Sequence, residues 1–200
     1  MKIGGLQKLT LLDFPEKVSC TIFTHGCNFR CPFCHNASLV VTEDKNLLLK
    51  QEDILSFLAS RQRLLEGVCI SGGEPLLQAD IENFIKQIKA MGYSVKLDTN
   101  GSMPDKLISL VKAGLIDYVA MDIKNSLHKY GMTICMENYD ISPIQESVAF
   151  LLSGTVHYEF RTTVVQELHT LEDFAQIGKL LHGAKKYFLQ PFEDSGDVIK

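Results

Sequence analysis

Three cysteines lie close together near the N-terminus, with the spacing Cys27-x3-Cys31-x2-Cys34. A cubane iron–sulfur cluster contains four irons and is usually held by four cysteine thiolates. Three thiolates at this spacing leave one iron without a protein ligand, and an open metal position is where chemistry takes place. The spacing therefore predicts a reactive iron–sulfur site. The alternative is a zinc site with His25 or His35 as the fourth ligand, although zinc sites more often pair two Cys-x2-Cys units.

The composition is typical of a globular protein with one domain and a substantial core: of 200 residues, 46% are hydrophobic and 22% are charged. The net charge of −4 provides no basic field, which disfavours nucleic acid as a partner. The N-terminus lacks the apolar region of a signal peptide, and no apolar run approaches a membrane span. We therefore expect a cytoplasmic protein that is monomeric when free. Six cysteines in such a chain indicate metal or redox chemistry rather than a disulfide framework.

Apolar, β-rich segments alternate with amphipathic helical segments along the chain. The segments that predict strands are 18–24, 67–71, 93–97, 117–123, 156–165 and 185–190. The segments that predict helices between them are 53–65, 81–91, 104–112, 142–152 and 171–181. This alternation predicts an α/β fold of right-handed βαβ units with a parallel sheet. Periodicity does not decide between an open doubly wound sheet and a partial barrel.

Polar and glycine-rich signals follow the ends of successive predicted strands. The cysteine segment 27–34 follows the first strand, 72–75 the second and 98–101 the third, while Asp122 and Lys124 close the fourth. Parallel α/β folds place their sites at the carboxyl ends of the strands. We therefore expect these groups, which are far apart in the sequence, to meet at one rim.

The cysteine spacing and its position directly after the first strand resemble the cluster motif of the radical S-adenosylmethionine (SAM) superfamily. In that family the open iron binds the amino and carboxylate groups of SAM, and reduction releases a 5′-deoxyadenosyl radical. The resemblance implies that Cys27, Cys31 and Cys34 hold a [4Fe–4S] cluster and that SAM is the second cofactor.

The same resemblance runs through most of the chain and implies a partial (β/α)6 barrel of parallel strands. Residues 18–192 would form this barrel within a single domain of residues 1–200. Residues 1–17 would be an N-terminal extension and residues 193–200 a short tail.

The segment 71–75, Ser-Gly-Gly-Glu-Pro, is similar to the family's GGEP motif, which holds the amino group of SAM. Gly72 and Gly73 would let the backbone approach the ligand, and the Glu74 carboxylate would meet its ammonium group. The simpler alternative is an ordinary turn between a strand and a helix.

The segments 97–101 and 121–124 are similar to two strand-end motifs of the glycyl-radical-enzyme activases within that superfamily. The resemblance implies that Asp98 and Asp122 lie near SAM and hold a monovalent cation, with Lys124 also near the ligand. Thr99 and the Met121 carbonyl are weaker candidates. The alternatives are a helix cap for Asp98 and a surface ion pair between Asp122 and Lys124.

Three further positions match the activases less strongly. Arg161, in Phe-Arg-Thr-Thr-Val-Val, would reach the SAM carboxylate, for which a planar guanidinium is suited; the alternative is a pair with Glu159. Phe33 would lie against the adenine, or be an ordinary core phenylalanine. Glu193 stands where related activases can carry a histidine near SAM, so this contact is left open.

His35-Asn36, the opening segment 4–15 and the strand-end motifs are most similar to anaerobic ribonucleoside-triphosphate reductase activating proteins. The resemblance implies hydrogen abstraction from a glycine of a partner glycyl radical enzyme, with a flavodoxin or ferredoxin as electron donor. The alternatives are a radical SAM enzyme acting on a small molecule, such as the 7-carboxy-7-deazaguanine synthases, and a non-catalytic zinc module. We expect the polar stretch 124–139 to be irregular and to belong to the docking surface.

The remaining cysteines have no partner at metal-binding spacing. Cys20 and Cys69 lie within predicted strands, where we expect them to pack as small apolar side chains. No pattern assigns a role to Cys135.

Overall fold

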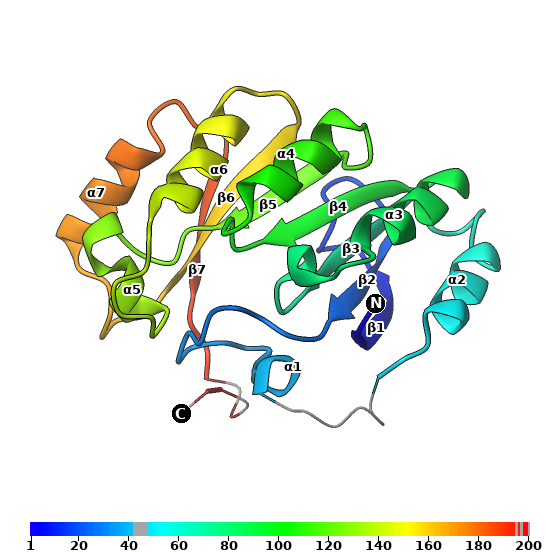
Figure 1. Ribbon diagram of the computed structural model, residues 1–200, viewed down its shortest axis with the longest axis horizontal. Helices are drawn as coiled ribbons and strands as arrows, with labels where there is room; N and C mark the ends of the chain where they lie inside the picture. Colours follow the sequence, from blue (N-terminus) through cyan, green and yellow to red (C-terminus); the bar gives the residue numbers. More distant parts are fainter. Residues whose placement is uncertain (42–47, 195, 197, 200) are drawn as a thin grey trace.

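The computed structural model describes residues 1–41, 48–194, 196 and 198–199. Its centre is a seven-stranded sheet whose strands lie in chain order, from β1 to β7 (Figure 1). The strands are Ile3–Thr10, Ser19–Thr24, Gly67–Gly72, Ser94–Thr99, Tyr118–Asp122, His157–Val164 and Tyr187–Pro191. Neighbours from β2 to β7 pair in parallel, and β1 pairs with β2 in the antiparallel direction. The predicted α/β fold with six parallel strands is confirmed, and among the described residues the sheet does not close.

The longer helices lie along one face of this sheet, as the predicted βαβ units require (Figure 1). The helices α1 to α7 are Ala37–Val41, Gln51–Ala59, Ile81–Ala90, Pro104–Lys112, Tyr130–Thr133, Ser142–Leu152 and Leu171–Leu180. In α3 the apolar residues Ile81, Phe84, Ile85 and Ile88 recur at helical spacing and are all buried. The helix predicted at 53–65 corresponds to α2, which begins at Gln51 and ends at Ala59, before the predicted end.

The strand β1 lies within the segment that the sequence predicts to be an N-terminal extension, and no strand was predicted there. Its register places Leu6 opposite Ile22 and Gln7 opposite Thr21 on β2. Glycines and polar residues are depleted in strands, and segment 3–10 contains both. Hydrogen bonding to β2, rather than local strand propensity, therefore stabilises this strand.

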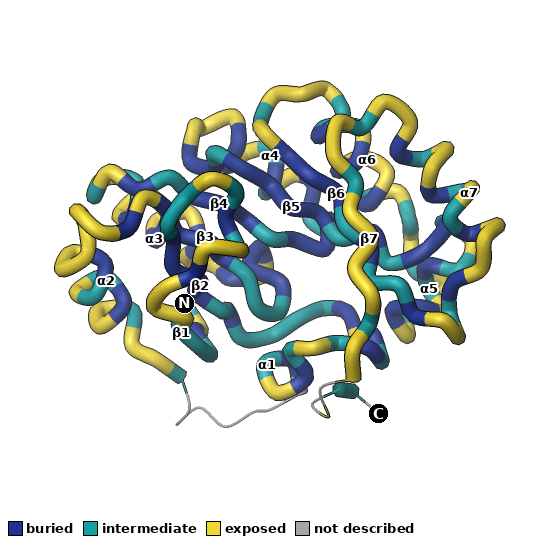
Figure 2. The backbone as a smooth tube through the Cα atoms, turned by 180° about the vertical axis from the view of Figure 1, so that it is seen from behind, coloured by how far each residue is buried: buried dark blue, intermediate teal, exposed yellow. Residues whose placement is uncertain are grey.

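Burial is greatest in the middle of the sheet (Figure 2). Val68, Cys69 and Ile70 in the centre of β3 are completely inaccessible to solvent. The edge strand β7 is mostly exposed (Figure 2). The buried middle is the rigid part of the molecule, and it holds the carboxyl ends of β2 to β6 in place.

The stretch 124–139 is more ordered than the sequence indicates. It contains a 3₁₀ turn, Leu127–Lys129, and the short helix α5. Ile134 is buried, and its carbonyl accepts a hydrogen bond from the Arg30 amide at 3.1 Å. Through this hydrogen bond the stretch contacts the cysteine segment and helps to hold it in place. No helix in the described parts of the chain is long and apolar enough to cross a membrane.

Candidate functional site

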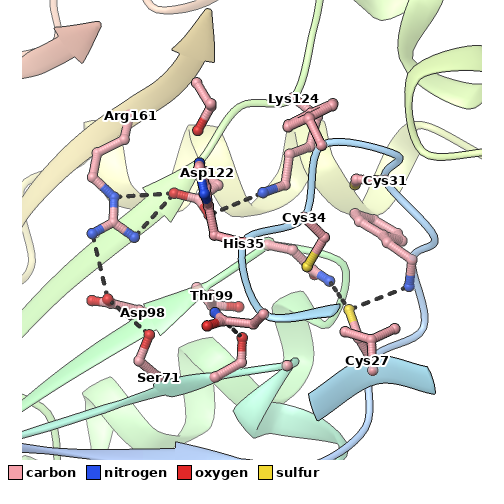
Figure 3. Close-up of a pocket in the computed structure, with 18 of the residues that line it drawn as sticks. Cys27, Cys31, Cys34, His35, Ser71, Asp98, Thr99, Asp122, Lys124 and Arg161 are labelled. Atoms are coloured by element: carbon pink, nitrogen blue, oxygen red, sulfur yellow. Dashed lines mark hydrogen bonds and ion pairs between the residues drawn. The ribbon is translucent and has the colours of Figure 1, made fainter. Parts of the chain in front are cut away.

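A cavity of about 430 Å³ lies at the carboxyl ends of the parallel strands, where the sequence predicts the site. It brings together ten of the eleven predicted site residues, which come from five separate segments of the chain (Figure 3). They are Cys27, Cys31, Phe33, Cys34, Gly72, Gly73, Asp98, Asp122, Lys124 and Arg161. Glu74 is the predicted residue that does not line the cavity.

The cysteine segment is held by backbone hydrogen bonds to its neighbours. The Gly26 amide donates to the Leu39 carbonyl at 2.8 Å, and the Gly26 carbonyl accepts from the Glu74 amide at 2.8 Å. Within the segment, the Cys34 amide donates to the Cys31 carbonyl at 3.1 Å. The segment after β2 is thus tied to the turn after β3.

The three cysteine side chains line the same cavity, in surroundings that suit metal-bound thiolates. Sγ of Cys27 accepts from the Phe29 amide at 3.4 Å and from Nδ2 of Asn100 at 3.9 Å. Burial raises the pKa of the Cys31 thiol to about 12, so a positively charged metal centre is needed to form the thiolate. No group of three His, Cys, Asp or Glu side chains in the described residues is arranged to hold a single metal ion.

The two glycines of the GGEP-like segment occupy places that a side chain cannot fill. Gly72 has φ +108°, and a Cβ there would lie 2.5 Å from the Thr24 backbone. A Cβ on Gly73 would lie 2.0 Å from the Gly26 carbonyl oxygen. The close approach of this turn to the cysteine segment therefore depends on glycine.

Glu74 faces away from the cavity and is completely buried. Its carboxylate accepts from the Asn100 amide at 2.7 Å, the Leu76 amide at 3.0 Å and Oγ1 of Thr99 at 3.0 Å. The predicted contact between this carboxylate and a ligand ammonium stays a prediction, because these three donors already bind the carboxylate in the structure. Glu74 instead fastens the turn after β3 to the end of β4.

The charged residues form a continuous network along the cavity wall (Figure 3). Arg161 donates to Oδ1 of Asp122 at 3.0 Å and to Oδ2 of Asp98 at 3.4 Å. Lys124 donates to Oδ2 of Asp122 at 3.0 Å. Asp98 is not a helix cap, and Glu159 is not the partner of Arg161 but accepts from the Tyr118 hydroxyl at 2.8 Å.

Lys96 is a member of this network that the sequence analysis missed. It precedes Asp98 by two residues on β4, so both side chains point to the same side of the sheet. Its side chain is 1% exposed, and its ammonium group binds Oδ1 of Asp98. A lysine inside an otherwise apolar strand was the available signal, because a lysine is almost never buried without a partner.

Opposing effects act on the two carboxyl groups. Burial raises the pKa of Asp98, but Arg161 and Lys96 outweigh it and hold the pKa below its ordinary value. Burial acts in the same way on Asp122, and Lys124 and Arg161 again lower the pKa. Both carboxylates are therefore charged at neutral pH.

Of the remaining candidates, Phe33 lines the cavity and Glu193 does not. Phe33 is buried, with its ring centroid 6.5 Å from that of Phe192, and His35 lies 5.3 Å from the same ring. Asn36, for which the sequence analysis proposed no contact, donates to the Gly72 carbonyl at 3.1 Å. Glu193 is exposed and does not line the cavity.

Five other residues considered from the sequence are also placed by the structure. Thr99 lines the cavity, although its hydroxyl is bound to Glu74, and Met121 is buried outside the cavity lining. Cys20 and Cys69 are buried in β2 and β3. Cys135 is exposed and lies outside the cavity.

Residues 21–181 match the model of the radical SAM superfamily. A protein of Methanocaldococcus jannaschii, provisionally named a glycyl-radical enzyme activating enzyme, is 34% identical over 96% of this chain and 80% of its own length. A search of solved structures finds SuiB of Streptococcus suis bound to the precursor peptide SuiA, with a TM-score of 0.69 and 14% identity, over 90% of this chain and 41% of SuiB. It also finds QueE of Escherichia coli, with a TM-score of 0.61 and 16% identity, over 98% of this chain and 85% of QueE.

These matches differ in what they show. The two structural matches establish the fold, and this chain spans less than half of SuiB. The family match covers most of the chain, including the cysteine segment, the glycine turn and the ion network. Proteins of this family use a [4Fe–4S] cluster together with SAM. The family match therefore supports the iron–sulfur prediction for the three cysteines over the alternative of a zinc site. The chain belongs to the radical SAM superfamily.

Proposed function

We propose that this protein is a radical SAM enzyme that activates a glycyl radical enzyme by removing a hydrogen atom from one of its glycines. The observation that carries the proposal is that three cysteines, a two-glycine turn and a network of partly buried charges share one cavity. The cavity volume of about 430 Å³ is within the range of small-molecule sites.

The three cysteines are the candidate ligands of the cluster, and the rest of the cavity wall is the candidate SAM site. When bound, the two cofactors supply an electron transfer that cleaves SAM and yields a 5′-deoxyadenosyl radical. Gly72 and Gly73 leave room for a ligand beside the cysteine segment. Arg161 and Lys124 place positive charge where a ligand carboxylate can bind, and Phe33 offers an apolar surface to a base.

The relative from M. jannaschii supports a protein substrate, because its name describes an activating enzyme and it aligns along 96% of this chain. The sheet is also open between β1 and β7 within the described residues, which leaves a side through which a loop of another protein can approach. The similarity of His35-Asn36 and the strand-end motifs supports anaerobic ribonucleoside-triphosphate reductase as the partner. A flavodoxin or ferredoxin is the proposed electron donor.

The test is electron paramagnetic resonance after anaerobic mixing of the reduced, reconstituted protein with SAM and candidate glycyl radical enzymes. We expect the doublet of a glycyl radical with the correct partner, together with methionine and 5′-deoxyadenosine. A partner whose target glycine is replaced by alanine is the matched control and should give no doublet. SAM cleavage without a protein radical for every candidate would favour a small-molecule substrate, and no SAM cleavage would refute the proposal.

A further inference from the structure

The buried ammonium group of Lys96 has one carboxylate partner. Its side chain is 1% exposed on β4, and Nζ binds Oδ1 of Asp98 and lies 4.0 Å from Sγ of Cys69. A buried lysine without a paired carboxylate is strongly disfavoured, so this contact determines where both groups lie.

Asp98 and Asp122, two of the three aspartates that line the cavity, accept hydrogen bonds from donors of the chain itself. Oδ1 of Asp98 binds Lys96, while Oδ2 accepts from Oγ of Ser71 at 3.1 Å and from Arg161 at 3.4 Å. Oδ1 of Asp122 binds Arg161, and Oδ2 binds Lys124. An additional cation would have to compete with these donors for the few acceptor positions that are left.

The balance of charge points the same way. Within the network, three positive side chains face two carboxylates, which leaves an excess of one positive charge. Two nearby acids, Asp13 and Glu159, are outside these ion pairs: Asp13 accepts from the Thr21 hydroxyl and Glu159 from the Tyr118 hydroxyl. The monovalent cation that the resemblance implies for Asp98 and Asp122 therefore does not fit the residues present.

We propose that Lys96 is a positioning residue whose tethered ammonium group takes the place of a bound monovalent cation beside Asp98. An ammonium group carries the charge of Na⁺ or K⁺ and is delivered by the fold, so no ion has to be recruited from solution. With Asp98 held by Lys96, Arg161 spans the two carboxylates and keeps its place on the cavity wall. The role in SAM binding rests on the proposed function.

The first test measures the equilibrium affinity for SAM of the reconstituted protein in choline, sodium and potassium chloride at equal ionic strength. We expect the wild-type affinity to be the same in all three salts. In Lys96→Met the affinity should fall about tenfold in choline chloride and return in sodium or potassium chloride, because a free cation can then enter beside Asp98. Lys89→Met is the matched control, since it removes a lysine–aspartate pair with Asp117 outside the cavity and should stay insensitive to the salt.

The second test needs no SAM and measures the ²³Na resonance of the reconstituted protein. We expect no saturable broadening with the wild type and saturable broadening with Lys96→Met that potassium reverses. The double variant Lys96→Met/Asp98→Asn removes both charges and should again show none, because no Asp98 carboxylate is left to hold the ion. If Lys96→Met does not fold, the wild-type measurement still tests the inference. Saturable broadening with the wild type, or wild-type SAM binding that requires Na⁺ or K⁺, would overturn the inference. If the wild type does not bind SAM in any salt, the proposed function fails while the ²³Na result still decides the role of Lys96.

Discussion

At the scale of single residues, burial acts differently on the acids of the cavity wall and on the acid behind it. Asp98 and Asp122 have cationic partners that lower the pKa more than burial raises it. Glu74 has no cationic partner among its hydrogen bonds, and burial raises its pKa to about 7 although three donors act in the opposite direction. A carboxyl group therefore forms part of a charged wall at Asp98 and Asp122 and fastens two turns together at Glu74.

Glu74 should make the stability of the fold depend on pH near neutrality. Its folded-state pKa of about 7 lies above the ordinary value of 4.5, so its contribution is complete below about 4.5 and is lost as the pH rises through 7. The difference corresponds to at most about 3 kcal/mol. We expect the thermal unfolding midpoint to fall by several degrees from about pH 5 to about pH 8.

The control for this pH dependence is Glu74→Gln, which does not titrate and should give a flatter profile. Its amide cannot accept from the Asn100 N–H through the nitrogen end, so its midpoint should also be lower at acid pH. Asp98 and Asp122 titrate below this window. An equal slope in the variant and the wild type would show that another group is responsible.

Cys31 is the most buried of the three candidate cluster ligands, and Cys31→Ser should remove one of them. We expect a reconstituted protein with less iron and sulfide per chain, weaker visible absorption and no formation of 5′-deoxyadenosine from SAM. Cys135→Ser changes an exposed cysteine outside the cavity and should behave like the wild type. A Cys31→Ser protein with a full cluster and normal SAM cleavage would refute the assignment.

At the scale of elements, the site depends on how closely the turn after β3 approaches the segment after β2. The Gly73 amide donates to the Thr24 carbonyl at 2.9 Å, and the Glu74 amide donates to the Gly26 carbonyl. These bonds continue the parallel pairing of β2 and β3 beyond the strand ends. The cysteine segment is therefore an extension of the sheet rather than an independent loop.

A single methyl group at Gly73 should disrupt this contact. In Gly73→Ala the Cβ would lie 2.0 Å from the Gly26 carbonyl oxygen, and the backbone would have to move. We expect a loss of more than about 2 kcal/mol in the free energy of unfolding and weaker SAM binding. Denaturant titration and equilibrium SAM binding would measure the two effects.

The same substitution at Gly178 is the matched control. Gly178 is exposed within α7, and nothing lies within 4 Å of an added Cβ. Alanine there should stabilise the protein by about 0.5 to 1 kcal/mol, because glycine is a poor helix former. A Gly73→Ala protein as stable as Gly178→Ala would contradict the close approach of the two segments.

At the scale of the whole molecule, the two ends of the sheet remain apart and the cavity is bordered by chain from both halves. The cysteine segment follows β2, while Phe192 follows the last strand and contacts Phe33 and His35 across the sequence. The C-terminal end of the described chain lies near α1 (Figure 1). The wall on this side therefore depends on contacts between residues about 160 positions apart in the sequence.

Removal of the Phe192 ring should loosen this wall. In Phe192→Ala the rings of Phe33 and His35 lose a neighbour, and we expect SAM to bind about tenfold more weakly, or about 1.4 kcal/mol. Phe188→Ala is the control, because Phe188 lies on β7 just before Phe192, is 48% exposed and makes no ring contact with Phe33 or His35 in the described residues. Equal SAM affinities of the two variants, measured by isothermal titration calorimetry, would argue against a role for Phe192 in the wall.

The sequence by itself determined that β2 to β7 are parallel and that the cysteines, the glycine turn, Asp98, Asp122 and Lys124 gather at one rim. Both follow from local information: apolar segments alternate with helical ones, and parallel strands bring their carboxyl ends together. The cluster spacing is also local, because the three cysteines lie in one short segment.

Only the tertiary structure decided the pairing of β1, the inward direction of Glu74, the bridge from Arg161 to two aspartates and the partner of Lys96. Each of these depends on which side chains face one another across strands far apart in the sequence, and on how much solvent they lose. Local periodicity contains neither distance nor burial. A carboxylate meant to meet a ligand and a carboxylate that clamps two turns are therefore indistinguishable until the chain has folded around them.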